Sequence, residues 1–392
     1  MQKGNSLNIF KRFFQSGAAS GIIIFSCVIL SLILANSALG AGLQALLNTS
    51  LGFSNNSIHL RYPVQLWIND GLMAIFFLMV GLEIKREMIA GELATPQKAL
   101  LPILCAIGGA LTPALIYFII NQNTPTKNGW GIPMATDIAF ALAIISMLSK
   151  RVPSSLKVFL AALAIVDDLL AILVIAFFYA GDLHMNYLAY AAGVAVLLFI
   201  LNRLKVTKLV CYLIPGAFMW YFIHHSGIHA TIAGVVTAMF IPATTTANAP
   251  SPLERLEHLL TTPVNFIIVP LFAFANTNIQ FEAGMPEGLA SPLGLGIIGG
   301  LLIGKPAGIL FTSFISTKTG IAKLPENANW KHLAGLGLLA GIGFTMSIFV
   351  ALLSFSDNLL IAEAKFSVLC ASLLSATLGY FLLKAGTRHN QY

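Results

Sequence analysis

The sequence of 392 residues carries very little charge. Asp, Glu, Lys and Arg make up 9% of it, whereas a soluble domain averages about 25%. Hydrophobic residues make up 57%, so a water-soluble fold would have a mostly apolar surface and is excluded. The apolar runs are long and do not alternate with polar residues. They therefore favour membrane-spanning α-helices over a β-barrel.

Cysteine is also scarce, and no polar stretch is long enough to fold alone. Cys27, Cys105, Cys211 and Cys370 lie inside apolar runs and form no CxxC pair, so they do not support a disulfide or a metal site. We therefore expect residues 1–392 to form a single integral membrane domain without a cofactor.

Twelve apolar stretches approach the length of about 20 residues that a membrane-spanning helix needs. They predict an all-α polytopic fold with spans at about 17–36, 64–82, 100–121, 129–148, 156–180, 186–201, 209–224, 226–242, 259–277, 292–315, 332–355 and 361–384.

Basic residues collect in alternate loops of this scheme. Only Arg61, Lys127 and Lys365 fall on the other side. This bias predicts that both termini, including a short N-terminal segment 1–15, are cytoplasmic in a bacterial inner membrane. The net charge of +7 is therefore a topology signal, and nucleic acid is not an expected partner. On the outer face, residues 45–62 form either a small hairpin or an irregular loop.

Two predicted spans contain helix-breaking residues. The fourth reads GWGIPMATDIAFALAI and includes Thr136 and Asp137, and the eleventh reads HLAGLGLLAGIGFTMSIF and includes Gly343. Each is the middle span of a group of three, spans 3–5 and spans 10–12, and the two run in opposite directions. This placement predicts inverted repeats with discontinuous helices at an ion site near mid-membrane. Frequent glycine in membrane helices is the alternative explanation.

Three acidic residues lie deep in the predicted spans: Asp137, Asp167 and Asp168. A carboxylate near mid-bilayer costs at least ~2.5 kcal/mol, so two in a row indicate a function. Adjacent helical residues point about 100° apart, and we expect the two aspartates to differ in role. Two like charges in a low dielectric also favour keeping a proton bound near neutral pH, as proton-coupled transport requires. A pair satisfied merely by hydrogen bonds is the structural alternative.

Lys305 is interpreted as the only base deep in a span, and Asp167 or Asp168 is its expected partner. It is either part of transport or a fixed structural ion pair. Thr136 adds a hydroxyl oxygen of the kind that suits a hard cation. Asp137 either binds the cation directly or compensates the positive ends of helices at the break.

A second polar cluster is predicted at the cytoplasmic rim. The segment GLEIKRE contributes Glu83, Arg86 and Glu87, and the segment ERLEH contributes Glu257 and His258. Such a network can respond to pH, because histidine titrates in the physiological range. A solvated helix end is the alternative interpretation.

Several strings of the sequence resemble the NhaA family of Na+/H+ antiporters, in the order of that family. They are WINDGLMAIFFLMVGLEIKREM (67–88), GIPMATDIAFALAI (131–144), LAIVDDLLAILVIAFFY (163–179), SGIHATIAGVV (226–236), RLEHLLTTPVNFIIVPLFAFAN (255–276), GKPAGI (304–309) and GIGFTMSIF (341–349). NhaA is itself one of the families that defined the inverted-repeat architecture, so the repeat is not independent support for the resemblance.

The resemblance implies that Asp168 is the principal Na+ and H+ carboxylate and that Asp167 works beside it and pairs with Lys305. It implies that Asp137 and Thr136 flank a crossing of helices 4 and 11. It also implies electrogenic exchange that accepts Li+, and a homodimer held partly by the outer hairpin. Activation at alkaline pH would act through residues matching Glu83, Arg86, Glu87, Glu257 and His258, with His229 as a further candidate.

The sequence departs from the family pattern at Glu254, where a basic residue is common, and at Thr261, where a histidine is common. The pH set-point is therefore not carried over. We expect sodium and protons to compete for the same carboxylates. Two other classes are alternatives: an intramembrane aspartyl protease, whose GxGD motif is absent, and a passive cation channel. A family member that prefers potassium is a finer alternative.

Overall fold

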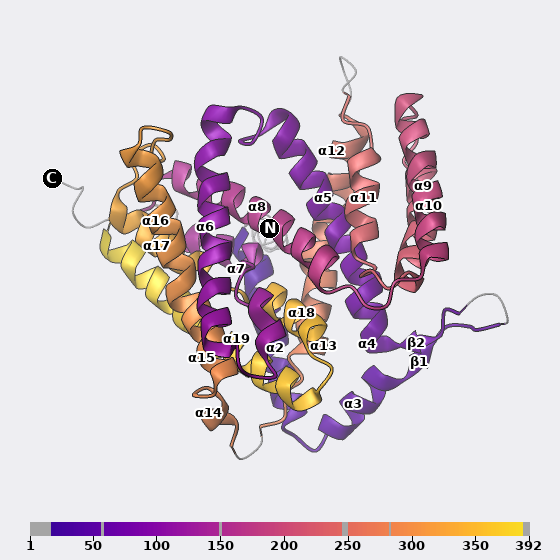
Figure 1. Cartoon of the computed structure of the whole chain (residues 1–392), viewed down its shortest axis with the longest axis horizontal. Coiled ribbons are helices and arrows are strands. Elements are labelled where there is room, and N and C mark those ends of the chain that lie inside the picture. The colour runs from indigo at the N-terminus through magenta and orange to yellow at the C-terminus, as the bar shows by residue number, and fades with distance from the viewer. Residues whose placement is uncertain (1–16, 56–58, 149–150, 245–249, 282–283, 387–392) are drawn as a thin grey trace, which may run out of the picture. The chain divides into compact units, whose positions relative to one another are not determined.

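The computed structural model describes residues 17–55, 59–148, 151–244, 250–281 and 284–386 (Figure 1). This part of the chain is helical except for one pair of two-residue strands. The chain divides into two compact units. The first comprises Met1–Ser26, Glu92–Ala171 and Phe281–Tyr392, and the second comprises Cys27–Gly91 and Ile172–Gln280.

Seven helices in the described residues are long and apolar enough to cross a membrane, or nine spans if each of two bent pairs counts once. The helical, polytopic character of the chain agrees with the prediction, whereas the number twelve stays a prediction. The helices α7, α10 and α11 explain part of the difference. They have 10, 16 and 9 residues, and at about 1.5 Å per residue each is too short to cross a hydrocarbon core of about 30 Å alone.

The first unit contains the part of the chain in which the sequence predicts an ion site. Its helices are α6 (Pro96–Asn121), α7 (Ile138–Met147), most of α8 (Ser154–Phe178), α14 (Met285–Gly288), α15 (Pro292–Gly299), α16 (Lys305–Lys318), α17 (Trp330–Ala340), α18 (Phe344–Ser354) and α19 (Asn358–Gly386). The helix α2 (Gly17–Ala35) begins in this unit. Within it, α16 packs along α6 and α17 packs along α19.

The structure has separate elements where spans 4 and 11 are predicted, and their discontinuity within a membrane stays a prediction. The fourth has a 3₁₀ turn at Lys127–Gly131, and α7 begins only at Ile138. The eleventh consists of α17 and α18, which are bent by 44° relative to each other at residues 341–343. A bent pair has fewer backbone hydrogen bonds of its own, so side chains of other elements must satisfy the free groups.

A π-helical turn at Gly300–Gly304 joins α15 to α16. Pro306 follows two residues later. It has no N–H to donate, and in a regular α-helix its ring would clash with the carbonyl of Leu302. A widened turn relieves that clash, and it places Lys305 at the first residue of α16.

A glycine stripe runs from Gly296 to Gly308 at four-residue spacing, which is typical of close helix packing. In the structure α6 occupies most of this face. A Cβ atom at Gly308 would lie 2.1 Å from the carbonyl oxygen of Gly108, and one at Gly304 would lie 2.8 Å from Cα of Pro113. The missing side chains therefore let the two backbones touch.

The second unit contains α3 (Gly40–Asn48), β1 (Ser50–Leu51), β2 (Tyr62–Pro63), α4 (Val64–Leu66), α5 (Met73–Ala90), α9 (Met185–Arg203), α10 (Val210–His225), α11 (Ile232–Phe240), α12 (Pro252–Pro263) and α13 (Val269–Asn276). A π-helical turn, Trp67–Leu72, joins α4 to α5. The helices α9 and α10 run side by side, and α11 packs on α5 (Figure 1).

The hairpin of the second unit is shorter than the predicted segment 45–62. Ser50 pairs with Pro63 and Leu51 pairs with Tyr62 in antiparallel register. Residues up to Asn48 belong to α3 instead, because the apolar end of GAGLQALLN continues as helix.

We expect Gly308→Ala to lower the stability of the protein by about 1–3 kcal/mol, because the added methyl group must push α6 and α16 apart. Thermal unfolding in detergent measures the effect. The matched control is Gly193→Ala on α9, where a Cβ would meet nothing within 4 Å. Equal unfolding temperatures for the two variants would contradict the packing argument.

Candidate functional site

Asp137 joins the two interrupted segments of the first unit. Its Oδ1 accepts a hydrogen bond from the backbone N–H of Phe140 at 3.1 Å and so caps the N-terminus of α7. Its Oδ2 accepts from both the backbone N–H (3.1 Å) and the hydroxyl of Thr345 in the first turn of α18. Its own N–H donates to the carbonyl of Ile342 at 2.6 Å. One carboxylate thus meets two positive helix ends, as expected if it compensates them.

Thr136 lies between the last turn of α17 and Asp167. Its hydroxyl oxygen is 2.7 Å from Asp167 Oδ2 and 2.8 Å from the carbonyl oxygen of Ala340. A hydroxyl has one hydrogen, so it donates to only one of these acceptors at a time. Which acceptor it serves depends on whether Asp167 carries a proton.

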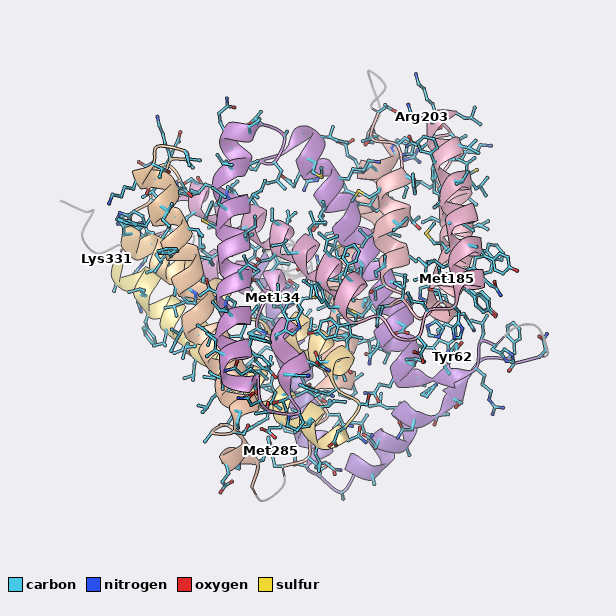
Figure 2. All side chains as sticks on the ribbon, viewed as in Figure 1. Tyr62, Met134, Met185, Arg203, Met285 and Lys331 are labelled. Carbon is cyan, nitrogen blue, oxygen red and sulfur yellow. The ribbon has the colours of Figure 1, made fainter. Side chains whose placement is uncertain are left out.

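Lys305 approaches Asp167 from α16. Its Nζ is 2.6 Å from Asp167 Oδ2 and also donates to the carbonyl of Met134, which Figure 2 labels. Both side chains are fully buried, so this is an ion pair without solvent screening. The structure therefore assigns Lys305 to Asp167, where the sequence left Asp167 and Asp168 open.

Lys305 is not the only buried base in the described residues, although the prediction that it is the only base deep in a span is not tested by this. Lys365 of α19 is 7% exposed and faces inward with Ala364 and Val368. The sequence did not indicate this burial, because the distance of a residue from the end of a span does not show which face of its helix packs inward.

Asp168 is 2% exposed and follows Asp167 on α8. Ala164 and Ala171, which share its helix face, are also buried and small. The side chain of Asp168 diverges from that of Asp167 by about 100°, so the two carboxyl groups meet different surroundings.

Serine side chains satisfy other backbone groups at the breaks, and the sequence reasoning missed them. Ser347 donates to the carbonyl of Ile132 at 2.7 Å, and Ser372 of α19 accepts from the N–H of Phe344 at 3.1 Å. Gly343 is needed here, because a Cβ atom would lie 2.1 Å from the Ser347 hydroxyl. Serine inside a strongly apolar helix was the available signal, but serine is too common to single out.

The buried charges of this site do not balance when every carboxyl group is ionised. Asp137, Asp167 and Asp168 provide three negative charges against the one positive charge of Lys305. The N-termini of α7 and α18 add about half a positive charge each. This set of groups is left with about one net negative charge, which one monovalent cation or one proton would neutralise.

The donor atoms around these residues are carboxylate, hydroxyl and carbonyl oxygens, which suit a hard cation such as Na+. Across the described ranges, no group of three or more His, Cys, Asp or Glu side chains is arranged to hold a metal ion.

The second unit contains the predicted polar cluster of α5 and α12. Arg86 Nε donates to both carboxylate oxygens of Glu257 at 3.0 Å, and Arg86 also pairs with Glu87 at 2.8 Å. Glu83 lies within electrostatic range of all three. Lys85 instead donates hydrogen bonds to the carbonyls of Met239 and Ile241 at the end of α11.

The remaining residues of ERLEH are arranged less closely. Glu254 forms a capping box with Ser251 at the start of α12, and His258 interacts electrostatically with Glu254. Thr261 donates to the carbonyl of Glu257 at 2.7 Å, so this departure from the family pattern has a local structural role.

His229 lies in a different cluster of the second unit from these residues. Its Nε2 is 3.5 Å from Asp70 Oδ1, and His224 Nδ1 is 3.1 Å from Asp70 Oδ2. The sequence reasoning missed Asp70, although an acidic residue in the apolar stretch WINDG was a usable signal.

Comparisons with known proteins identify the family of this chain. A family model described as "Na+/H+ antiporter 1" matches residues 11–383. The chain is 59% identical to "Na(+)/H(+) antiporter NhaA 2" of Flavobacterium johnsoniae, covering 100% of this chain and 96% of that protein. It is 50% identical to "Na(+)/H(+) antiporter NhaA" of Pelagibacter ubique, over 95% and 96% of the two chains. The chain belongs to the NhaA family of Na+/H+ antiporters.

Proposed function

We propose that this protein is a secondary transporter that exchanges cytoplasmic Na+ for external H+ and so serves sodium and pH homeostasis. The family membership and the names of the relatives support exchange of these two ions, and those relatives are transporters rather than enzymes. The single observation that carries the proposal is the group of three buried carboxyl side chains, Asp137, Asp167 and Asp168, with Lys305 paired to Asp167.

Sodium is the cargo, and no cofactor is part of the proposal. Asp168 is the principal Na+ ligand and proton carrier, and Asp167 works beside it. The hydroxyl of Thr136, 2.7 Å from Asp167, provides a further oxygen. Li+ has the same charge and the same preference for oxygen ligands, so we propose that it is accepted as well.

Competition follows from the charge of the site. One Na+ neutralises it, and a second positive charge would have to stay buried without a partner, so sodium displaces protons. We also propose that more than one proton enters for each Na+ that leaves, so that exchange moves net charge and is electrogenic.

Lys305 and Thr136 provide a way to couple protonation to the broken helices. A proton on Asp167 would weaken its pairing with Lys305. It would also let Asp167 donate to Thr136, which would then donate to the carbonyl of Ala340. The end of α17 would therefore respond to the protonation state, and we propose that this response accompanies alternate opening of the site to the two sides of the membrane.

The proposal includes the finer family properties. Twelve spans in a bacterial inner membrane, cytoplasmic termini and crossing of the interrupted spans 4 and 11 within inverted repeats complete the architecture. A homodimer uses the hairpin formed by β1 and β2. Activity rises at alkaline pH through the Arg86 cluster, which includes Glu83, Glu87 and Glu257.

We expect sodium to collapse a proton gradient in proteoliposomes containing the intact protein but not in those containing Asp168→Asn. The amide keeps the size of the side chain and removes its charge and its proton exchange. Dequenching of a pH-sensitive dye measures the gradient.

The matched control is Asp182→Asn, which changes an exposed aspartate and should behave like the intact protein. If sodium has no effect on a stable gradient with any variant, exchange is excluded. A sodium current that persists without a proton gradient and without proton movement would instead favour a passive channel.

We also expect Glu257→Gln and Arg86→Gln to shift the pH profile of exchange in opposite directions, by about 0.5–1 pH unit. Removing a negative charge lets the neighbouring carboxylates lose their protons at lower pH, so Glu257→Gln activates earlier. Removing the positive charge of Arg86 has the reverse effect. Initial rates of dye dequenching from pH 6 to 9 (about the range in which histidine and buried carboxyl groups titrate) give the profiles.

Glu92→Gln is the control, since Glu92 forms a long 3.7 Å pair with the exposed Lys98 and does not belong to the Arg86 cluster. Shifts of the same sign in Glu257→Gln and Arg86→Gln would refute an electrostatic role for this cluster.

A further inference from the structure

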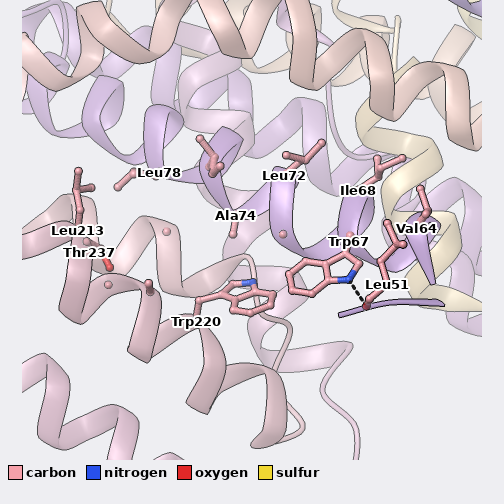
Figure 3. Close-up of a pocket in the computed structure, with 15 residues that line it drawn as sticks. Leu51, Val64, Trp67, Ile68, Leu72, Ala74, Leu78, Leu213, Trp220 and Thr237 are labelled. Carbon is pink, nitrogen blue, oxygen red and sulfur yellow. Dashed lines mark hydrogen bonds between the residues drawn. The ribbon is translucent and has the colours of Figure 1, made fainter. Parts of the chain in front are cut away.

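The second unit contains an elongated groove of about 560 Å³ that the exchange reaction does not use. Its walls come from α4, α5 and the turn between them, together with α10 and α11 (Figure 3). Leu51 and Val64 lie at one end, and Leu78, Leu213 and Thr237 lie at the other.

The groove is long enough to span the hydrocarbon depth of one lipid leaflet. Val64 and Leu78 are fourteen residues apart on one nearly continuous helix, which corresponds to ~21 Å. Half of a hydrocarbon core of about 30 Å is ~15 Å. The wall formed by Val64–Ala90 is itself a candidate membrane span, so the groove runs along the direction of the acyl chains.

The groove recognises an apolar ligand, because the polar side-chain atoms of its lining are already hydrogen-bonded. Trp67 Nε1 donates to the carbonyl of Leu51 at 3.1 Å, and Trp220 Nε1 donates to the carbonyl of Asp70 at 3.1 Å. The hydroxyl of Thr237 donates to its own helix at 2.7 Å. The stacked rings of Trp67 and Trp220, with centroids 5.8 Å apart, present only apolar surface.

The groove is open at its rim, where lipid surrounds a spanning helix. Leu51 is 53% exposed and Ile75 is 37% exposed, although both line it. Paired tryptophans are typical of the membrane–water interface, which places the Leu51 end of the groove at the headgroup level.

A basic residue lies next to that end of the groove along the chain. Arg61 is exposed and precedes Tyr62, the strand partner of Leu51. It is also the single Lys or Arg between Arg12 and Lys85 in the sequence. A guanidinium group binds phosphate oxygens well, so Arg61 complements a phospholipid headgroup.

We propose that this groove binds one acyl chain of an anionic membrane phospholipid, with its phosphate at Arg61. The chain fills the space between α5 and α10 and holds the two helices together from the outer leaflet. This site is independent of the proposed exchange at Asp168.

The test is photo-crosslinking of the full chain, reconstituted with phosphatidylglycerol that carries a diazirine near the end of one acyl chain. Mass spectrometry then locates the adducts. We expect about tenfold more adduct per exposed residue on Leu213–Ala217 and Ile75–Leu78 than on exposed positions of α9, and competition by unlabelled phosphatidylglycerol.

Ala217→Leu fills the groove from an exposed position and should remove this enrichment. The matched control is Ala189→Leu, an exposed alanine of α9 outside the groove, which should leave it unchanged. Monodisperse elution of both variants shows that each is folded. Arg61→Gln should reduce the enrichment for phosphatidylglycerol.

If the amount of adduct depends only on the exposure of each residue and is unchanged in Ala217→Leu, the proposed binding site is wrong. Enrichment that is insensitive to Arg61→Gln would overturn the phosphate contact.

Discussion

The need to satisfy every buried backbone and charged group from within the protein governs the site, because hydrocarbon provides neither water nor counter-ions. At the interruption of α17 and α18, Asp137 caps two helix N-termini, and Thr136 meets the carbonyl of Ala340. Ser372 from α19 accepts a hydrogen bond from the N–H of Phe344, and Lys305 from α16 donates one to the carbonyl of Met134. The breaks therefore persist because side-chain contacts replace the helical hydrogen bonds that were lost.

The same count of charges supports the proposed cation site. When Asp137 caps two helix N-termini and Lys305 pairs with Asp167, the three ionised carboxyl groups still hold about one negative charge in excess. A buried excess charge is costly, so under the proposal a proton or a sodium ion occupies the site. Its pairing network also links that choice to the backbone, since Thr136 touches both Asp167 and the end of α17.

The sequence predicted the features that follow from composition and spacing. Lipid-spanning helices, the buried Asp167 and Asp168 and the glycine stripe towards Gly308 could all be read from apolar runs and their interruptions. Contacts between distant segments could not. The polar residues Ser372 and Asp70 were visible in apolar stretches, but no pattern indicated that Ser372 caps α18, that Asp70 pairs with two histidines or that Lys365 is buried. Each depends on which helix face packs inward, and small, nearly uniform apolar residues do not specify that face.

Calorimetry of sodium binding to the purified protein, in buffers of different ionisation enthalpy, tests the competition most directly. The account predicts that each bound Na+ releases at least one proton at pH values where the carboxyl groups are protonated. The apparent dissociation constant should then rise about tenfold per unit fall in pH for each proton displaced. Sodium binding without proton release, at an affinity independent of pH, would contradict competition for the same carboxylates.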